Sequence, residues 1–272
     1  MRRTFAQVLQ EGKIDIRKEY SKLHSIFYEC PRYTANSVAD IVAKNFLAIP
    51  FRKTCLSLEE FNTMHGFKFP HCLIEPDVNC FVGFCEYIFN LTVFLKEECF
   101  NTFLSKRLCI DHIRSVIEAI GYMEVSEDGI FIFVPKDNVA ISVAEMNAIP
   151  ATISYKVVSY HHHSMKGDLD SKKQTLLAFA DLLEPKRKEL DSADSKLATD
   201  LFYAFNNFNI RHNNIDPSGP KYKKPVGDLN SEQLEEWYDE VYQMCLLAFM
   251  RLEHIPRKVK FDMLKDRIEN KK

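Results

Sequence analysis

The sequence predicts a mainly α-helical protein with one small α/β insert. Hydrophobic residues recur at helical spacing along most of the chain, and a composition with 21 Phe and only 8 Gly does not suit a turn-rich β protein. A single strong hairpin signal confines the β structure to one short stretch. We therefore expect an N-terminal helical unit (1–105), a small α/β layer with a β-hairpin (106–160) and a C-terminal helical bundle (161–272).

The bulk composition is that of a globular protein with a sizeable core. Of the 272 residues, 46% are hydrophobic and 27% are charged, and the formal net charge is −2. No segment is a polybasic arm, so we expect no extended binding of duplex DNA. The short lysine and arginine clusters leave two alternatives, contacts with a few phosphates or merely a solvated basic turn.

The cysteines and the N-terminus predict a cytoplasmic protein. None of the 8 cysteines forms a C-x-x-C pair, and most lie in apolar runs, which is typical of reduced, buried thiols. The charged, amphipathic start does not resemble a signal peptide. The most apolar run, Cys80 to Leu95, is interrupted by Glu86 and Asn90 and is too short to span a bilayer, so we expect no membrane partner.

The N-terminal unit is expected to be helical throughout. Amphipathic spacing predicts helices near Tyr20–Phe27 and Ser37–Leu47, and a largely buried helix at Phe81–Phe94. Between them, Ser57 and Glu60 have the spacing of a capping box, in which hydroxyl and carboxylate each accept a backbone N–H of the first turn. The helix that they start should end near Gly66, because glycine adopts the left-handed conformation easily.

The middle segment is expected to carry the β structure. An amphipathic helix that ends at Gly121 comes first. Strands follow on either side of Asp128-Gly129, a dipeptide that supplies the positive φ of a tight hairpin. Beyond the hairpin we expect a helix at Val139–Met146 and a third short strand at Ile153–Tyr160.

The C-terminal segment is expected to hold the longest helices. An amphipathic helix at Lys172–Glu184 should be interrupted by Pro185. A second helix begins near Ser195. The last long helix should begin at Asn230, with Gln233 completing its cap, and should break at Ile255-Pro256 before a short charged helix.

The asparagine-rich loop between the last two long helices is the candidate site. It contains Asn206, Asn207, Asn209, Arg211, His212, Asn213 and Asn214. An arginine fork binds a phosphate or carboxylate, and a histidine can take or give a proton near neutral pH. We therefore assign Arg211 and His212 as candidate catalytic residues and the five asparagines as binding residues.

The same loop has a purely structural alternative. Asparagine tolerates the left-handed conformation and bonds its own main chain, so an Asn-rich segment is also a good helix-to-loop transition. In this alternative Arg211 merely binds carbonyl groups at a helix end.

Other positions complete the candidate set. Tyr222 and Lys223 follow the loop and are included as binding residues, as are His162 and Lys166, provided that their segment folds beside it. We expect no metal ion and no other cofactor, because the histidines and cysteines match no zinc-ligand spacing. Arg107 and His112 have an R-x4-H spacing, which we set aside because positions five apart on a helix do not share a face well.

Parts of the chain resemble bacterial abortive-infection (Abi) proteins. The resemblance rests on the runs 160–168 (YHHHSMKGD), 182–187 (LLEPKR) and 206–214 (NNFNIRHNN), and on segments 57–69 and 85–91. Abi proteins of this kind end in a HEPN-like helical domain. Many HEPN domains are dimeric, metal-independent ribonucleases with an R-x4–6-H motif. The resemblance implies such a domain at 161–272, with Arg211 in the arginine position. The sequence departs from the motif because His212 is adjacent to the arginine.

From the loop and the resemblance together, we expect a phage-defence protein whose C-terminal domain cleaves or binds RNA and forms a homodimer through its C-terminal helices. Arg211 would hold the phosphate and His212 would act as acid and base. The alternative is a non-catalytic module in which the loop binds a protein, nucleotide or RNA partner.

Overall fold

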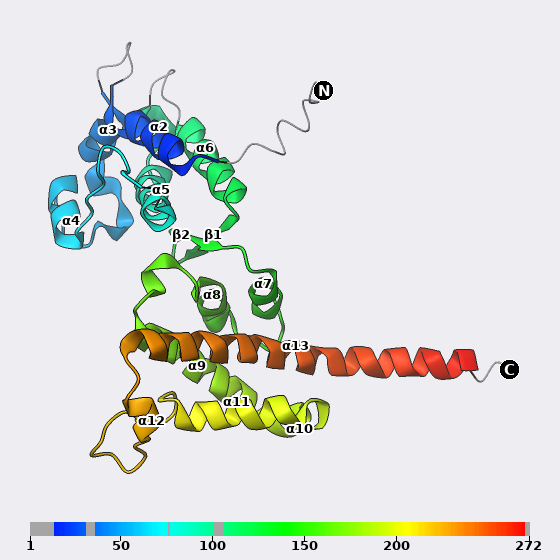
Figure 1. The fold of residues 1–272 in the computed structure, drawn as a ribbon. Helices are drawn as coiled ribbons and strands as arrows, with labels where there is room; N and C mark the ends of the chain where they lie inside the picture. Colours follow the sequence, from blue (N-terminus) through cyan, green and yellow to red (C-terminus); the bar gives the residue numbers. More distant parts are fainter. Residues whose placement is uncertain (1–13, 31–35, 76, 101–105, 270–272) are drawn as a thin grey trace, which may run out of the picture. The chain divides into compact units, whose positions relative to one another are not determined.

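The described part of the chain is mainly α-helical and carries one two-stranded antiparallel hairpin, as the sequence predicts (Figure 1). A computed structural model describes residues 14–30, 36–75, 77–100 and 106–269. The chain forms two compact units, residues 1–136 and 137–272. Each unit has its own hydrophobic core.

Unit 1 is built around the buried helix α5 (Val78–Val93). Its other helices are α2 (Ile16–Tyr28), α3 (Val38–Lys44), α4 (Leu58–His65) and α6 (Lys106–Ala119). Phe81, Phe84 and Phe89 of α5 are fully buried, and α5 packs against α2, α6 and the hairpin.

The predicted start and end signals of α4 are confirmed in part. The Ser57 hydroxyl accepts the N–H of Glu60 at 3.1 Å, and Gly66 ends the helix with φ 69°. The Glu60 carboxylate differs from the prediction, because it accepts the N–H of Leu56 and not that of Ser57.

The hairpin consists of β1 (Tyr122–Glu127) and β2 (Ile130–Pro135). Asp128 and Gly129 both have positive φ, 51° and 78°, so the predicted tight turn is confirmed. Two polar residues of α5 explain how the hairpin is held. Asn90 exchanges two hydrogen bonds with the main chain of Phe131, and the Glu86 carboxylate accepts the N–H of Phe133. The residues that interrupt the apolar run therefore bind the free edge of β2.

Unit 2 is wholly helical in its described part. Its elements are α7 (Asn138–Ala144), α8 (Ala151–Ser159), η4 (His163–Met165), α9 (Leu169–Leu183), η5 (Glu184–Lys186), α10 (Arg187–Ala193), α11 (Ser195–Asn207), α12 (Lys224–Gly227) and α13 (Ser231–Glu269). Helix α13 packs against α9, α10, α11 and α7. Asn230 and Gln233 cap its start by a reciprocal pair of hydrogen bonds, as predicted.

Three predictions on the chain's organisation differ from the structure. The predicted middle layer is divided, because its hairpin packs on α5 whereas α7 packs on α8 and α13. The predicted strand at Ile153–Tyr160 is helical instead: residues 153–159 belong to α8, whose Val157 lies in the core of unit 2, and Tyr160 is its C-cap. The predicted break at Pro256 is absent, and α13 continues through this exposed position without the hydrogen bond that proline cannot donate.

A buried lysine joins α9 to α13. Lys172 is 4% exposed, and its ammonium lies 2.8 Å from Glu235 Oε1 and 2.6 Å from Asp239 Oδ1. It also lies over the Tyr160 ring, 5.2 Å from the centroid. Partial burial alone would raise the pKa of Glu235, but hydrogen bonds from Lys172 and from the Gly167 N–H outweigh it and lower this pKa.

Among the described residues, each helix is either too short or too polar to cross a membrane.

We expect Lys172→Ala to lower the free energy of unfolding of unit 2 by about 2 kcal/mol, because it leaves two partly buried carboxylates without their cation. Part of the stability difference should disappear as pH falls below 4.5, since the folded-state pKa of Glu235 is depressed and protonation removes its ion pair. Urea unfolding followed by fluorescence measures this in unit 2 alone, because Trp237 is the single tryptophan of the chain.

Lys188→Ala is the matched control, since Lys188 is exposed on α10. Equal stability of the two variants at pH 7 would contradict a structural role for the Lys172 pair.

Candidate functional site

The predicted asparagine-rich loop is held in place by its own side chains. Asn209 is buried and adopts the left-handed conformation with φ 58°. Its N–H donates to Asn214 Oδ1 at 2.9 Å, and the N–H of Asn214 donates to Asn209 Oδ1 at 3.3 Å. The Asn209 amide also donates to the Tyr238 hydroxyl of α13, which donates back to the Asn209 carbonyl. The loop is therefore fixed to α13, as a polar site would require.

The remaining asparagines divide between structural contacts and solvent. The side-chain amides of Asn206 and Asn207 each donate to the carbonyl one turn earlier in α11. Asn214, which is fully buried, donates its amide to the Lys221 carbonyl at 2.8 Å. Asn213 is exposed. Most of the predicted binding amides are thus engaged with the protein's own main chain.

Arg211 is engaged in the same way. Its Nη2 donates to the Ala180 carbonyl of α9 at 3.0 Å, and its Nη1 forms an ion pair with Glu184. The guanidinium also lies 5.5 Å from the centroid of the Phe205 ring. The side chain is 21% exposed. These contacts fasten the loop to the end of α9 and agree with the structural alternative for Arg211.

His212 differs from its neighbour. It is partly exposed and forms no side-chain hydrogen bond or ion pair with any described residue. An arginine that binds Glu184 and a histidine without a hydrogen-bond or ion-pair partner among the described residues do not form a prepared catalytic pair. The catalytic assignment of these two residues stays a prediction.

The other predicted binding residues lie around the loop or away from it. The Lys223 N–H donates to the Asn214 carbonyl, and its side chain is exposed. The Tyr222 ring packs so closely on Gly227 that an added Cβ would lie 2.6 Å from it. His162 is buried and caps η4, with its Nδ1 2.7 Å from the Ser164 hydroxyl. Lys166 is exposed.

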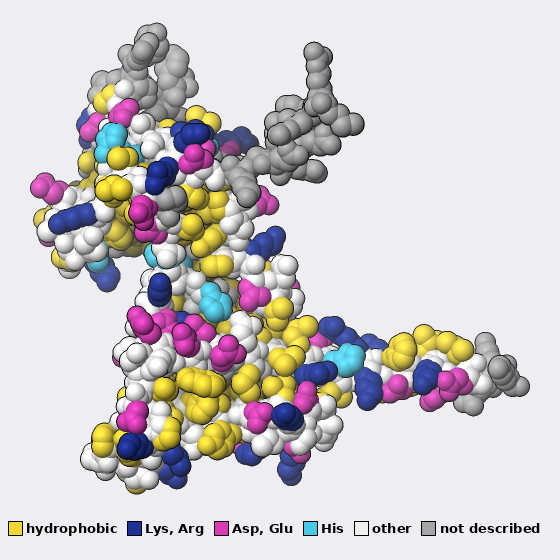
Figure 2. Space-filling view, viewed as in Figure 1, with side chains coloured by type: hydrophobic (Ala, Val, Ile, Leu, Met, Phe, Trp, Pro, Cys, Tyr) yellow, Lys and Arg dark blue, Asp and Glu magenta, His cyan; other side chains and the backbone are white. Residues whose placement is uncertain are grey.

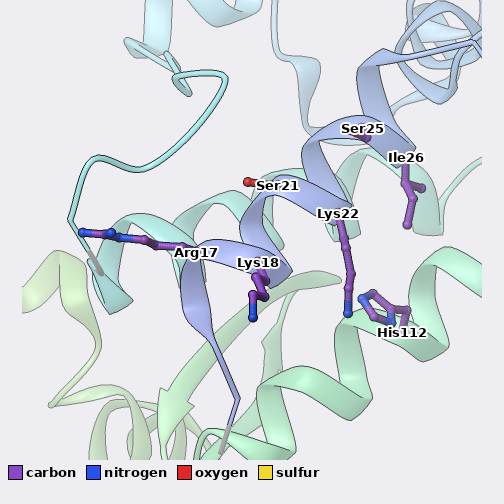
Figure 3. Close-up of a pocket in the computed structure, with 7 residues that line it drawn as sticks. All are labelled: Arg17, Lys18, Ser21, Lys22, Ser25, Ile26 and His112. Carbon is purple, nitrogen blue, oxygen red and sulfur yellow. The ribbon is translucent and has the colours of Figure 1, made fainter.

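A second candidate site lies in unit 1, on a pocket between α2 and α6 (Figure 3). The pocket has a volume of about 650 Å³, and its lining residues are Arg17, Lys18, Ser21, Lys22, Ser25 and Ile26 of α2 and His112 of α6. Lys18 and Lys22 extend toward the side on which His112 lies, whereas Arg17 points the other way. The two lysines, Lys18 and Lys22, make this side of the pocket suitable for an anion.

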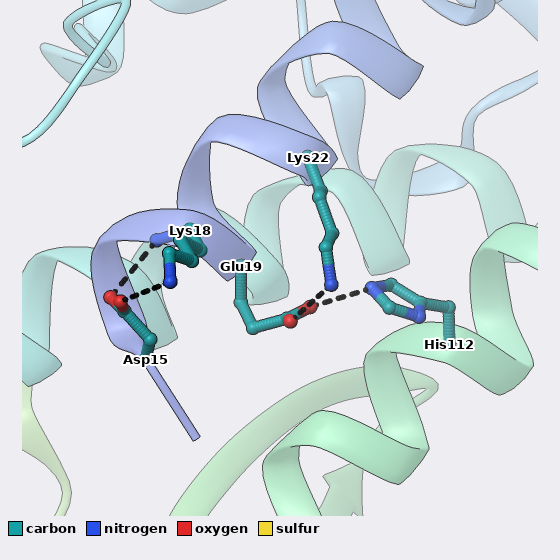
Figure 4. Close-up of polar contacts among 5 residues, drawn as sticks. All are labelled: Asp15, Lys18, Glu19, Lys22 and His112. Atoms are coloured by element: carbon teal, nitrogen blue, oxygen red, sulfur yellow. Dashed lines mark hydrogen bonds and ion pairs between the residues drawn. The ribbon is translucent and has the colours of Figure 1, made fainter. Parts of the chain in front are cut away.

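Glu19 organises the polar groups of this pocket (Figure 4). Its carboxylate is nearly buried, with 11% of the side chain exposed. One oxygen lies 2.5 Å from Lys22 Nζ, and the other lies 3.2 Å from His112 Nε2. The second contact is close but not aligned as a hydrogen bond, so it is mainly electrostatic. Among the described residues, the Lys18 ammonium pairs with the exposed Asp15 alone, at 3.4 Å.

This arrangement combines a phosphate-binding group with a group that can transfer a proton. The Glu19 carboxylate faces one nitrogen of the imidazole and favours a proton on it, which leaves the other nitrogen for proton transfer. Lys18 can move from Asp15 to a phosphate because both side chains are exposed. No metal ion is required for either role.

The sequence patterns do not predict this site. His112 is the histidine of the R-x4-H spacing, and it lines a further shallow pocket together with Arg107. Positions five apart on α6 therefore do border one surface, although Arg107 pairs with Asp111 at 3.3 Å. The Lys18–Glu19–Lys22 pattern of α2 was the only other signal, and such patterns are common on solvated helices.

Comparison of the chain with protein-family models, curated proteins and solved structures finds no match. The assignment of a function therefore rests on the geometry and on the sequence resemblance.

We expect Arg211→Ala to lower the free energy of unfolding of unit 2 by about 2 kcal/mol, because it leaves the Ala180 carbonyl without its donor and removes a charge-assisted contact. His212→Ala should change it by less than about 0.5 kcal/mol. Urea unfolding followed by Trp237 fluorescence measures both, since Trp237 packs against Phe208 at the start of the loop.

The two variants control for each other because they are adjacent in one loop. A larger loss of stability in His212→Ala than in Arg211→Ala would contradict the structural role of Arg211.

Proposed function

We propose that this protein binds single-stranded RNA at the α2–α6 pocket of unit 1 and cleaves it without a metal ion. The observation that carries the proposal is the Glu19–His112 contact beside the Lys18 and Lys22 side chains. It supports the RNA-directed activity expected from the sequence, but at different residues. Arg211 and His212 are less suitable because the arginine already binds Glu184 and the Ala180 carbonyl.

The proposed reaction is a transfer within the RNA chain. The 2′-hydroxyl oxygen attacks the neighbouring phosphorus, and the imidazole of His112 takes its proton through the nitrogen that does not face Glu19. The bond from phosphorus to the 5′-oxygen breaks, and that oxygen receives a proton from solvent. A cyclic phosphate and a free 5′-hydroxyl are the products. Lys18 and Lys22 stabilise the negative charge that develops on the phosphate oxygens.

On the resemblance to Abi proteins alone, we further propose that the activity serves defence against phage. Pairing of two copies through the C-terminal helices stays a prediction. The non-catalytic alternative retains the same anionic ligand and omits the cleavage step.

We expect the purified protein to cleave labelled single-stranded RNA in EDTA and to leave cyclic phosphate ends. His112→Gln should slow cleavage by about a hundredfold or more, while RNA affinity stays within about twofold, because glutamine still reaches Glu19 and no phosphate contact is lost. The double variant Lys18→Gln, Lys22→Gln should weaken RNA binding about tenfold and flatten its salt dependence. Gel analysis and fluorescence anisotropy measure the two effects.

Lys68→Gln and His212→Ala are the controls, one an exposed lysine of another groove in unit 1 and the other the alternative catalytic histidine. Loss of cleavage in His212→Ala with full activity in His112→Gln would contradict the proposed site and would assign cleavage to the asparagine-rich loop of unit 2.

The defence proposal predicts a phenotype in bacteria. Expression of the protein should reduce phage plaques, and the His112→Gln variant, produced to the same level, should not. Equal protection by both would separate defence from cleavage at His112.

A further inference from the structure

The second half of α13 carries no buried residue: Leu252 still packs on the core of unit 2 and Arg251 pairs with Asp194, but residues 256–269 are all exposed. Figure 1 shows α13 continuing beyond the helices that pack against its first half. Phe249 is its last buried residue, and none of residues 251–269 is buried. At 1.5 Å per residue this segment extends roughly 28 Å. An exposed helix of that length needs an explanation wherever its side chains are hydrophobic.

The second half of α13, residues 251–269, is rich in exposed hydrophobic side chains and is called the projecting half below. Five of them are more than half exposed: Val259 (55%), Phe261 (66%), Met263 (56%), Leu264 (55%) and Ile268 (67%). Figure 2 shows hydrophobic side chains gathered near the end of α13, with Lys and Arg beside them. Clustered apolar side chains on a soluble surface mark an interaction site.

Part of this set forms a heptad seam. Residues at alternating steps of three and four along the exposed side of α13 are Leu247, Met250, His254, Arg257, Phe261, Leu264 and Ile268. Met250 still packs on the core of unit 2, but the rest of the seam is distinct from the face of α13 that lines the core, which carries Val241, Cys245 and Ala248. Its last three members lie within about 60° of the helix circumference at 100° per residue. A stripe this narrow suits a second helix packed along it.

The width of the seam disfavours a lipid surface. A helix that lies on a bilayer presents a broad apolar face. Here lysines and arginines border the seam closely on both sides, Lys260 and Arg267 on one and Lys258 and Lys265 on the other. These side chains stand where the flanking positions of a paired helix would be.

The charge of these flanking positions disfavours a second copy of the chain. In an antiparallel pair that places Phe261 opposite Leu264 of the other chain, Lys258 faces Lys265 and Lys260 faces Arg267 of that chain. In a parallel pair, Lys260 faces Lys265 of the other chain. Like charges across a helix pair are destabilising, whereas glutamates or aspartates at those positions would form ion pairs with the lysines.

We propose that the projecting half of α13 docks an acidic amphipathic helix of another protein. Apolar side chains of the partner pack on Phe261, Leu264 and Ile268, and its carboxylates pair with the flanking lysines and Arg267. The inference is independent of the RNA-directed activity proposed for unit 1, because it rests on other residues in the other unit.

The test uses the full chain and a fluorescent synthetic helix with Leu at the two seam positions of each heptad and Glu at the flanking positions. Such a peptide does not pair with itself near neutral pH, because its own glutamates repel. We expect it to bind, and we expect Phe261→Ala combined with Leu264→Ala to weaken binding at least about tenfold. Added salt should also weaken binding. Val259→Ala with Met263→Ala is the matched control, since these side chains are equally exposed but lie off the seam, and it should bind within about twofold of the unchanged protein.

Several outcomes would overturn the proposal. Equal binding of a peptide with Lys in place of Glu would remove the charge argument, and no binding of the acidic peptide would remove the docking site. Binding to phosphatidylserine vesicles that the Phe261 and Leu264 changes abolish would assign the seam to a membrane. A concentration-dependent dimer in sedimentation that the same changes abolish would assign it to a second copy.

Discussion

The structure of unit 2 depends on the polar and aromatic contacts that hold the first half of α13 against α8 and α9. The ammonium of Lys172 is removed from solvent, and it is stable there only because Glu235 and Asp239 of α13 both contact it. One turn further along, the Tyr242 ring stacks on Tyr160 with centroids 3.9 Å apart, and the Tyr242 hydroxyl donates to the Val157 carbonyl. These contacts hold α8, α9 and α13 together. They therefore fix the position of α13 within unit 2.

The asparagine-rich loop shows that rigidity and availability compete. Buried polar groups must be hydrogen-bonded, so a loop that carries buried Asn209 and Asn214 has to use their amides within the protein. The same amides are then unavailable to a ligand. Arg211 illustrates the point most clearly, because its planar fork matches the Ala180 carbonyl and the Glu184 carboxylate as well as it would match a phosphate.

The α2–α6 pocket has the opposite balance. Glu19 is nearly buried and organises its neighbours, while Lys18 stays exposed. The Glu19 carboxylate therefore stays beside the His112 imidazole, while the Lys18 ammonium remains available to an anion. The projecting part of α13 likewise leaves its groups available, since residues 256–269 are all exposed.

The sequence by itself determined the features that arise within a few residues. The mainly helical class, the Asp128-Gly129 turn, the left-handed stop at Gly66, the Asn230–Gln233 cap and the interruption at Pro185 all follow from local hydrogen bonding and backbone sterics. Tertiary structure decided the rest. The segment Ile153–Tyr160 carries too short an apolar pattern to distinguish strand from helix, and burial of Val157 among α9 and α13 residues settles it. Whether Arg211 is free, and whether His112 has a carboxylate beside it, depends on Glu184 and Glu19, residues far away in the chain. Local periodicity cannot report such partners, because the pairing of charges and the burial of polar groups are fixed only when distant segments pack together.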